Sequence, residues 1–256
     1  MDPTERFTTR AEQYARYRPD YPPGALELLK LRCGLKAGTR VADLGSGTGI
    51  LTRRLLEEGA EVFAVEPNAA MREAAEEALS GRPGFHSVTG TAEQTTLPAA
   101  SVELLVAAQA FHWFDVAAAR QEALRIVRAG GWGALLWNER VRGSDAFMDA
   151  YEALLRRHAP EYDAITGSRA DPEAMRRFLG GRMEEASFPN AQWLDFESLH
   201  GRLQSASYAP EPGTPQYAPL RGALRELFEQ HAQKGRVRYP YETRIYFAQM
   251  KPPSAA

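Results

Sequence analysis

A cluster of small and acidic residues near position 45 has the types and spacing of a ligand-binding turn. The order is Asp43-x-Gly45-x-Gly47-x-Gly49, directly after the apolar stretch Val41–Leu44. Glycine lets the backbone approach a ligand more closely than a side chain would allow. A dinucleotide site uses the spacing G-x-G-x-x-G, so that a pyrophosphate meets a helix N-terminus. Here the spacing is G-x-G-x-G and a carboxylate precedes it, which disfavours a pyrophosphate. A purely structural glycine turn is the alternative.

A second carboxylate, Glu66, follows the next apolar stretch, Glu61–Val65, about twenty residues past the glycines. At the end of a strand, a carboxylate can accept hydrogen bonds from both hydroxyls of a ribose. S-adenosylmethionine has a ribose, a sulfonium and an ammonium group but no phosphate, so acidic groups at Asp43 and Glu66 suit its charge. The alternative for Glu66 is a solvated charge at the start of a helix.

The elements that must position these residues alternate between strand and helix. Short apolar runs predict buried strands, and Asn68 and Asp115 have the residue types of helix N-caps. Gly130-Gly131 is expected to end the helix that begins after Asp115. The predicted strands are 41–44, 61–65, 85–89, 102–108 and 132–137, and the predicted helices are 50–58, 69–80 and the one following Asp115. This order predicts a parallel sheet with helices on both faces.

The second half of the chain has a different pattern. Helices are predicted over 144–158, 171–179 and 220–231, and alternating residues in 184–195 and 236–250 predict antiparallel strands at the sheet edge. We therefore expect an α/β, Rossmann-like, doubly wound, mostly parallel seven-stranded sheet with an antiparallel edge and a helical insertion or cap. The expected single domain divides into an N-terminal arm and helix (1–35), a cofactor-binding core (36–141), the insertion or cap (142–182) and C-terminal strands with substrate-side elements (183–256).

Several segments resemble the class I S-adenosylmethionine-dependent methyltransferases, closest to the trans-aconitate methyltransferase-like, type 11 branch. They are Phe7, Tyr14–Pro22, Val41–Thr52, Val65–Asn68, Thr91–Pro98 and Ala108–Asp115.

The resemblance implies a cofactor site for S-adenosylmethionine. Its methionine end would be held by Asp43, Gly45, Ser46, Gly47, Thr48 and Gly49, its ribose by Glu66 with Pro67, and its adenine near Ala92 and Glu93. Gln109 would border the cofactor. Many relatives carry Asp at the position of Thr91 to accept the adenine amino hydrogen, so this departure leaves adenine recognition to Glu93 or the backbone.

The aromatic N-terminal arm is a candidate lid. Tyr14, Tyr17, Arg18 and Tyr21 would otherwise be an irregular arm with aromatic anchors. In resembling enzymes such an arm closes over the cofactor, and a guanidinium can pair bidentately with a carboxylate of the cofactor or of a substrate. We assign Tyr14 and Arg18 to the cofactor, and Tyr17 and Tyr21 to the substrate.

Methyl transfer is an in-line displacement that depends mainly on alignment in a dry pocket, so a base is optional. His112 is the candidate base for a hydroxyl acceptor, whereas a carboxylate acceptor needs none. Trp113, Arg140 and Tyr208 with its neighbour Ser207 are candidate substrate contacts, as is His112, with a surface or packing role as the alternative for each.

Composition narrows the function classes. The net charge of −2 gives no electrostatic sign of nucleic-acid binding, and Cys33 is the only cysteine, so no disulfide within the chain and no metal cluster are expected. No apolar run approaches the roughly 18 residues of a membrane span. We expect a cytoplasmic protein acting on a small-molecule acceptor, at a carboxylate or hydroxyl oxygen. The alternatives are a non-catalytic S-adenosylmethionine-binding regulator and a nicotinamide-dependent oxidoreductase.

Overall fold

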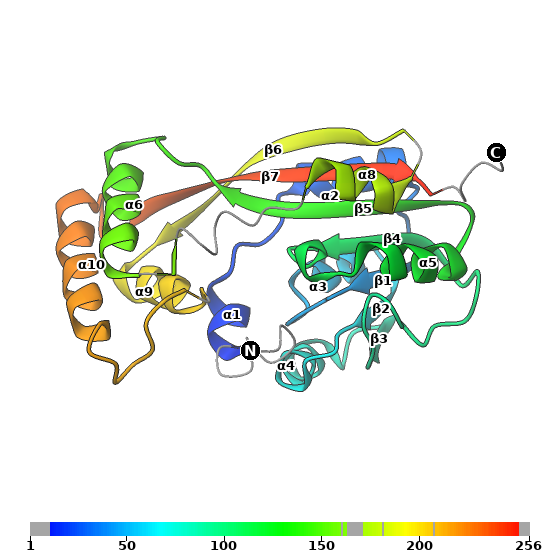
Figure 1. Ribbon diagram of the computed structural model, residues 1–256, viewed down its shortest axis with the longest axis horizontal. Coiled ribbons are helices and arrows are strands. Elements are labelled where there is room, and N and C mark those ends of the chain that lie inside the picture. The colour runs from blue at the N-terminus through cyan, green and yellow to red at the C-terminus, as the bar shows by residue number, and fades with distance from the viewer. Residues whose placement is uncertain (1–10, 160, 163–170, 181, 207, 251–256) are drawn as a thin grey trace.

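The computed structural model describes residues 11–159, 161–162, 171–180, 182–206 and 208–250. Phe7 and Ser207 lie outside the described residues. The described chain forms a seven-stranded sheet of order β3-β2-β1-β4-β5-β7-β6, which confirms the predicted fold class (Figure 1). The strands are β1 (Arg40–Leu44), β2 (Glu61–Val65), β3 (Phe85–Val88), β4 (Val102–Ala108), β5 (Val127–Arg140), β6 (Glu184–Leu194) and β7 (Val237–Gln249).

The five strands from β3 to β5 are parallel, so their carboxyl ends lie at one edge of the sheet. Asp43 of β1 lies in register with Ala64 of β2 and with Val106 of β4. Because of this register, the residues just past β2 and β4 lie beside the glycine turn that follows β1. The strand order therefore brings the two predicted carboxylates to the same place.

One expectation for the sheet is wrong in detail and another is confirmed. The helix α5 (Val116–Ile126) ends four residues before Gly130, and β5 begins at once, so Gly130-Gly131 lies inside a strand. The predicted antiparallel edge is confirmed: β7 pairs antiparallel with both β5 and β6, and β6 is the outermost strand. Sequence alternation gives burial on one face of a strand but does not tell which neighbours the strand has.

Helices cover both faces of the sheet. On one face, α2 (Pro23–Cys33) and α3 (Ile50–Glu57) pack on side chains such as Val41, Leu104 and Ile245. On the other face, α5 and α8 (Pro172–Leu179) pack on side chains such as Leu105 and Leu135. The predicted caps are confirmed at Asn68, which begins α4 (Ala69–Leu79), and at Asp115, which begins α5.

A third apolar cluster lies beyond the parallel strands, where β6 and β7 extend past the core. It joins α6 (Ala146–His158), α9 (Phe196–Gln204) and α10 (Tyr217–His231), which gather at one end of the molecule in Figure 1. We call these three helices the cap. They come from both sides of the division expected at residue 182, while α8 packs on the sheet. The division of the chain into domains stays a prediction.

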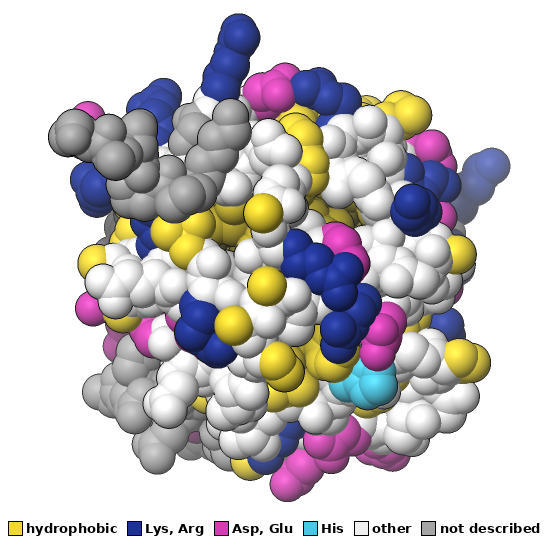
Figure 2. Space-filling model, turned by 90° about the vertical axis from the view of Figure 1, so that its right-hand side faces the viewer, with side chains coloured by type: hydrophobic (Ala, Val, Ile, Leu, Met, Phe, Trp, Pro, Cys, Tyr) yellow, Lys and Arg dark blue, Asp and Glu magenta, His cyan; other side chains and the backbone are white. Residues whose placement is uncertain are grey.

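The charges on the surface and the apolar content of the helices concern the partners that the protein could bind. Figure 2 shows basic and acidic side chains close together on the face turned to the viewer. Among the described residues, no helix has both the length and the apolar content that a membrane crossing requires.

Candidate functional site

The glycine turn joins β1 to α3 in a conformation that suits glycine. The backbone φ angles of Gly45, Gly47 and Gly49 are 65°, 57° and 81°, in the left-handed region that other residues rarely adopt. The turn is held against β2, because the N–H groups of Gly45 and Ser46 both donate to the carbonyl of Val65, at 2.9 and 3.1 Å.

The three glycines differ in what surrounds them. A Cβ atom at Gly45 would lie 2.6 Å from the Cβ of Ala110, and one at Gly49 would lie 2.6 Å from Cδ1 of Leu79. A Cβ at Gly47 would meet nothing within 4 Å. The outer glycines therefore allow close packing, whereas Gly47 faces open space in which a ligand can approach the backbone.

Asp43 is a buried carboxylate with one free acceptor. It is fully buried, and its Oδ2 accepts a hydrogen bond from Thr52 Oγ1 at 2.7 Å. Its Oδ1 is also buried but has no hydrogen-bond partner among the described residues. Burial raises the pKa of Asp43 to about 7, and the nearby Glu66 adds to the shift. A buried carboxylate oxygen without a hydrogen-bond partner is suited to accept a hydrogen bond from a cationic group of a ligand.

Glu66 connects the glycine turn to the end of β2. Its Oε2 accepts from the Gly47 N–H and its Oε1 from the Asn68 N–H, both at 2.9 Å. Burial raises the pKa of Glu66, while these two hydrogen bonds act in the opposite direction. Each carboxylate oxygen has a second lone pair, so Glu66 can still accept from two hydroxyls. The hydroxyls of Ser46 and Thr48 are buried and without partners among the described residues.

The predicted adenine neighbourhood lies after β3. Ala92 is buried, and Glu93 Oε1 accepts from the N–H of Asp115 at 2.9 Å. Thr91 exchanges backbone hydrogen bonds with Gln94. Glu93 thus already serves the start of α5, and its role in adenine recognition stays a prediction, as does that of the partly buried Pro67.

The N-terminal arm is helical, in contrast to the irregular arm considered from the sequence. Tyr14 and Tyr17 lie on α1 (Ala11–Tyr17), which packs on α9 of the cap and also contacts α4. In Figure 1, α1 lies between the cap and the parallel part of the sheet. Gly201 of α9 makes this close contact possible, because a Cβ there would overlap the ring of Tyr17.

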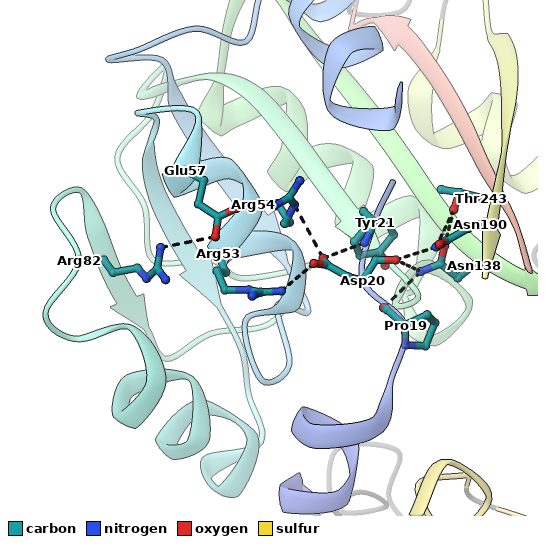
Figure 3. A network of polar contacts seen from close by, with 10 residues as sticks. All are labelled: Pro19, Asp20, Tyr21, Arg53, Arg54, Glu57, Arg82, Asn138, Asn190 and Thr243. Atoms are coloured by element: carbon teal, nitrogen blue, oxygen red, sulfur yellow. Dashed lines mark hydrogen bonds and ion pairs between the residues drawn. The ribbon is translucent and has the colours of Figure 1, made fainter. Parts of the chain in front are cut away.

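The segment after α1 is fixed by a polar network, shown in Figure 3. The backbone carbonyl of Asp20 accepts from the side-chain amides of Asn138 and Asn190, at 3.3 and 2.7 Å. Its carboxylate pairs with Arg53 of α3 at 2.7 Å. Thr243 donates to Asn138, which holds that amide in place. The network ties the arm to α3, β5, β6 and β7, and no motif in the sequence predicts it.

A small pocket opens between the arm, the start of α3, the carboxyl ends of β4 and β5, and α9 of the cap. Tyr21 is buried in its wall, and the left-handed residue Gln109 (φ 60°) donates from Nε2 to the carbonyl of Asn138 at 3.2 Å. The lining residues are Tyr14, Arg18, Pro19, Tyr21, Ile50, Gln109, Asn138 and Arg202. The structure thus brings together the predicted Tyr14, Arg18, Tyr21 and Gln109. Tyr17 does not line this pocket, and its side chain packs on Gly201 instead.

The remaining predicted substrate residues do not line this pocket. His112 and Trp113 are exposed on the short helix η2 (Phe111–Trp113), with their ring centroids 4.8 Å apart. Arg140 pairs with the buried Glu152 at 2.5 Å, which gives it a structural partner. Tyr208 packs edge-on against Tyr162, with ring centroids 5.0 Å apart. The roles proposed for these residues stay predictions.

Sequence reasoning missed two residues that line the pocket, Asn138 of β5 and Arg202; Arg202 is the charged one. It lies on α9, in a segment for which no helix was predicted, and no motif marks it. Only its burial in the folded chain distinguishes Arg202. That burial depends on tertiary contacts between the cap and the arm, which cannot be read from the sequence.

The strand order and the site together define a class I methyltransferase fold. Comparisons with known proteins agree. Residues 42–135 match the family model described as a methyltransferase domain. An uncharacterized methyltransferase of Mycobacterium tuberculosis is 39% identical over 160 residues, which cover 62% of this chain and 63% of that protein. A methyltransferase-like protein of Schizosaccharomyces pombe is 27% identical over 206 residues, covering 79% of this chain and 77% of that protein.

Solved structures show the same fold. A putative type II methyltransferase from Anaeromyxobacter dehalogenans has a TM-score of 0.65 at 24% identity, covering 92% of this chain and 99% of that one. A putative methyltransferase from an antibiotic biosynthesis pathway of Anabaena variabilis has a TM-score of 0.58 at 20% identity, with 90% and 98% covered. These two likenesses show the fold. Residues 42–135 match the model of the methyltransferase domain family, whose cofactor is S-adenosylmethionine.

Proposed function

We propose that the whole protein transfers the methyl group of S-adenosylmethionine to a small-molecule acceptor by in-line displacement. The observation that carries the proposal is the pair of buried carboxylates, Asp43 and Glu66, on either side of a left-handed glycine turn. The free Oδ1 of Asp43 and the open space at Gly47 fit an ammonium group next to bare backbone. A pyrophosphate would instead be repelled by these carboxylates.

The roles of the residues follow from their positions. Asp43 would accept from the methionine ammonium, Glu66 would accept from the ribose hydroxyls, and Arg18 with Tyr14 would face the methionine carboxylate. The bound cofactor supplies an electrophilic methyl group. The chain aligns the acceptor beside Gln109 and excludes water through α1, so that most of the acceleration comes from orientation.

The acceptor atom is proposed to be a carboxylate or hydroxyl oxygen. A carboxylate is ionised at neutral pH, whereas a hydroxyl would use His112 as base. The resemblance to the trans-aconitate methyltransferase-like branch supports the carboxylate.

Titration calorimetry with S-adenosylmethionine, S-adenosylhomocysteine and NAD tests the cofactor. We expect both sulfur compounds to bind in the low-micromolar range and NAD not to bind. Tighter binding of NAD would overturn the proposal. The non-catalytic alternative predicts binding without turnover, so a methyl-transfer screen over small acids and alcohols distinguishes it.

A further inference from the structure

Two arginines from distant parts of the chain meet at the pocket. Arg18, just after α1, donates from Nη2 to the carbonyl of Ser205 at 2.8 Å. Arg202 of α9 donates from Nη1 to the hydroxyl of the same Ser205 at 3.4 Å and from Nε to Tyr241 Oη at 2.8 Å. Arg202 is buried, and the Nε of Arg18 is buried without a hydrogen-bond acceptor.

Among the described residues, no carboxylate oxygen lies within 4.0 Å of a guanidinium nitrogen of either arginine. Arg140, which lies in the neighbouring tyrosine cluster, shows the contrast, because Glu152 neutralises it. Burial lowers the pKa of Arg18, and the positive charge of Arg202 lowers it further. A guanidinium remains protonated in proteins, so the pocket holds two positive charges without a compensating negative charge from the described chain.

Aromatic rings offset part of the free-energy cost of burying these two positive charges. The guanidinium of Arg18 lies 4.6 Å from the ring centroid of Tyr14, and that of Arg202 lies 5.7 and 5.8 Å from those of Tyr239 and Tyr241. The stabilisation that a cation gains over an aromatic face is smaller than the cost of burying its charge without a counter-ion. An anionic ligand would supply the missing compensation.

The cofactor can supply only part of that charge. S-adenosylmethionine has one carboxylate, which can neutralise one guanidinium. Arg18 lies over the ring of Tyr14 in α1, and α1 contacts α4. We therefore assign Arg18 to the carboxylate of the cofactor. Arg202 comes from the cap and is left for a different group.

We propose that the methyl acceptor binds as an anion, with a carboxylate or phosphate group held by Arg202. This inference rests on the proposed function and names the substrate class of the same site. The two guanidiniums then separate the two anions, and Arg202 selects acceptors that carry a negative charge. The aromatic walls suit the carbon skeleton of a small organic acid.

The test measures ligand-induced thermal stabilisation of the full chain saturated with S-adenosylhomocysteine. The probes are succinate, glutarate and inorganic phosphate at 10 mM. Glutaramide is the neutral control, and sodium chloride is matched for ionic strength. We expect at least one anion to raise the Tm by about 2 to 4 °C, as mass action predicts for millimolar affinity, and neither control to do so.

Variants then locate the effect. Arg202→Gln is expected to abolish the anion-dependent rise while the Kd for S-adenosylhomocysteine changes less than about twofold. Arg128→Gln, which removes a half-exposed ion pair with Glu103, should respond as the wild type does. If Arg202→Gln does not fold, Arg202→Lys replaces it, because a point charge loses the two-pronged contact and should weaken anion binding about tenfold.

Several results would overturn the proposal. They are an anion response no larger than that of chloride, an unchanged response in Arg202→Gln, or a tenfold loss of S-adenosylhomocysteine affinity in that variant. The last would make Arg202 a cofactor contact. Failure of S-adenosylhomocysteine to bind the wild type would instead remove the proposed function itself.

Discussion

Asp43→Asn is the substitution whose effect the structure defines most sharply. The amide has nearly the shape of the carboxylate and still offers an oxygen to the Thr52 hydroxyl. The change removes the negative charge and little else. It therefore separates the electrostatic role of Asp43 from its role in packing.

The expected effect depends on pH. Burial raises the pKa of Asp43 from 3.8 to about 7, so the folded state holds its proton more tightly than the unfolded state does. The free energy of unfolding of the wild type therefore falls as the pH rises from about 4 to about 7. At about 1.4 kcal/mol per pKa unit, the full loss is roughly 4 kcal/mol, an upper limit that water penetration reduces. Asp43→Asn has no such loss.

Urea unfolding at pH 4, 6 and 8 measures this difference. We expect the variant to be close to the wild type at pH 4 and more stable by about 2 to 4 kcal/mol at pH 8. Asp149→Asn, an exposed change on α6, should show no such trend. A stability difference that is constant with pH, or that shrinks as the pH rises, would refute the assignment of a buried, weakly compensated carboxylate.

The same residue governs cofactor binding. A ligand ammonium stabilises the ionised form, so binding to the wild type should release a proton near neutral pH and tighten between pH 6 and 7.5. Calorimetry in buffers with different ionisation enthalpies detects this proton. Asp43→Asn should bind S-adenosylhomocysteine more weakly, and its affinity should not follow this pH dependence.

Three further outcomes are expected. Glu66→Gln should weaken the binding of S-adenosylhomocysteine by about 1.5 to 3 kcal/mol. It should also lower the stability of the fold, because the amide cannot accept from both backbone N–H groups. Calorimetry and urea unfolding measure the two effects, with the exposed change Glu73→Gln as control. Arg18→Ala should weaken S-adenosylhomocysteine at least tenfold and leave methylthioadenosine, which lacks the carboxylate, unchanged; equal losses for both ligands would end the carboxylate assignment. Gly47→Ala should cost about 1 to 2 kcal/mol in backbone strain and abolish cofactor binding, whereas Gly49→Ala should destabilise the fold more, because its Cβ would overlap Leu79; thermal unfolding with and without ligand compares the two.

The parallel core was predictable because its signals are local. The strands β1, β2 and β4 are short, mostly apolar runs, whereas β3 is weaker. The caps at Asn68 and Asp115 are made by the side chains of these residues themselves. Gly130-Gly131 misled the prediction because glycine is common after helices, while here it lies inside β5 and Gly131 fits under Val127. Helix α9 was missed, although Asp195 caps it through the N–H of Ser198.

The candidate site divides in the same way. Asp43, Glu66 and the glycines could be found because their spacing along the chain determines their spacing in the turn. Arg202 could not, because nothing near it in the sequence distinguishes a buried arginine from a surface one. Arg140 shows the same ambiguity, since its pairing with Glu152 places it in a structural ion pair at the cap.

The part of the pocket that faces the acceptor exists only when three distant segments meet. Arg18 follows α1 and Arg202 belongs to α9. Ser205, just after α9, accepts a hydrogen bond from each of them, through its carbonyl and its hydroxyl. The cofactor turn, by contrast, is built within β1, α3 and the end of β2. A chain of this fold can therefore change its acceptor by changing the arm and the cap, while the turn that holds the methyl donor stays the same. For this reason the charge left uncompensated between arm and cap is the more informative guide to the acceptor than any motif in the core.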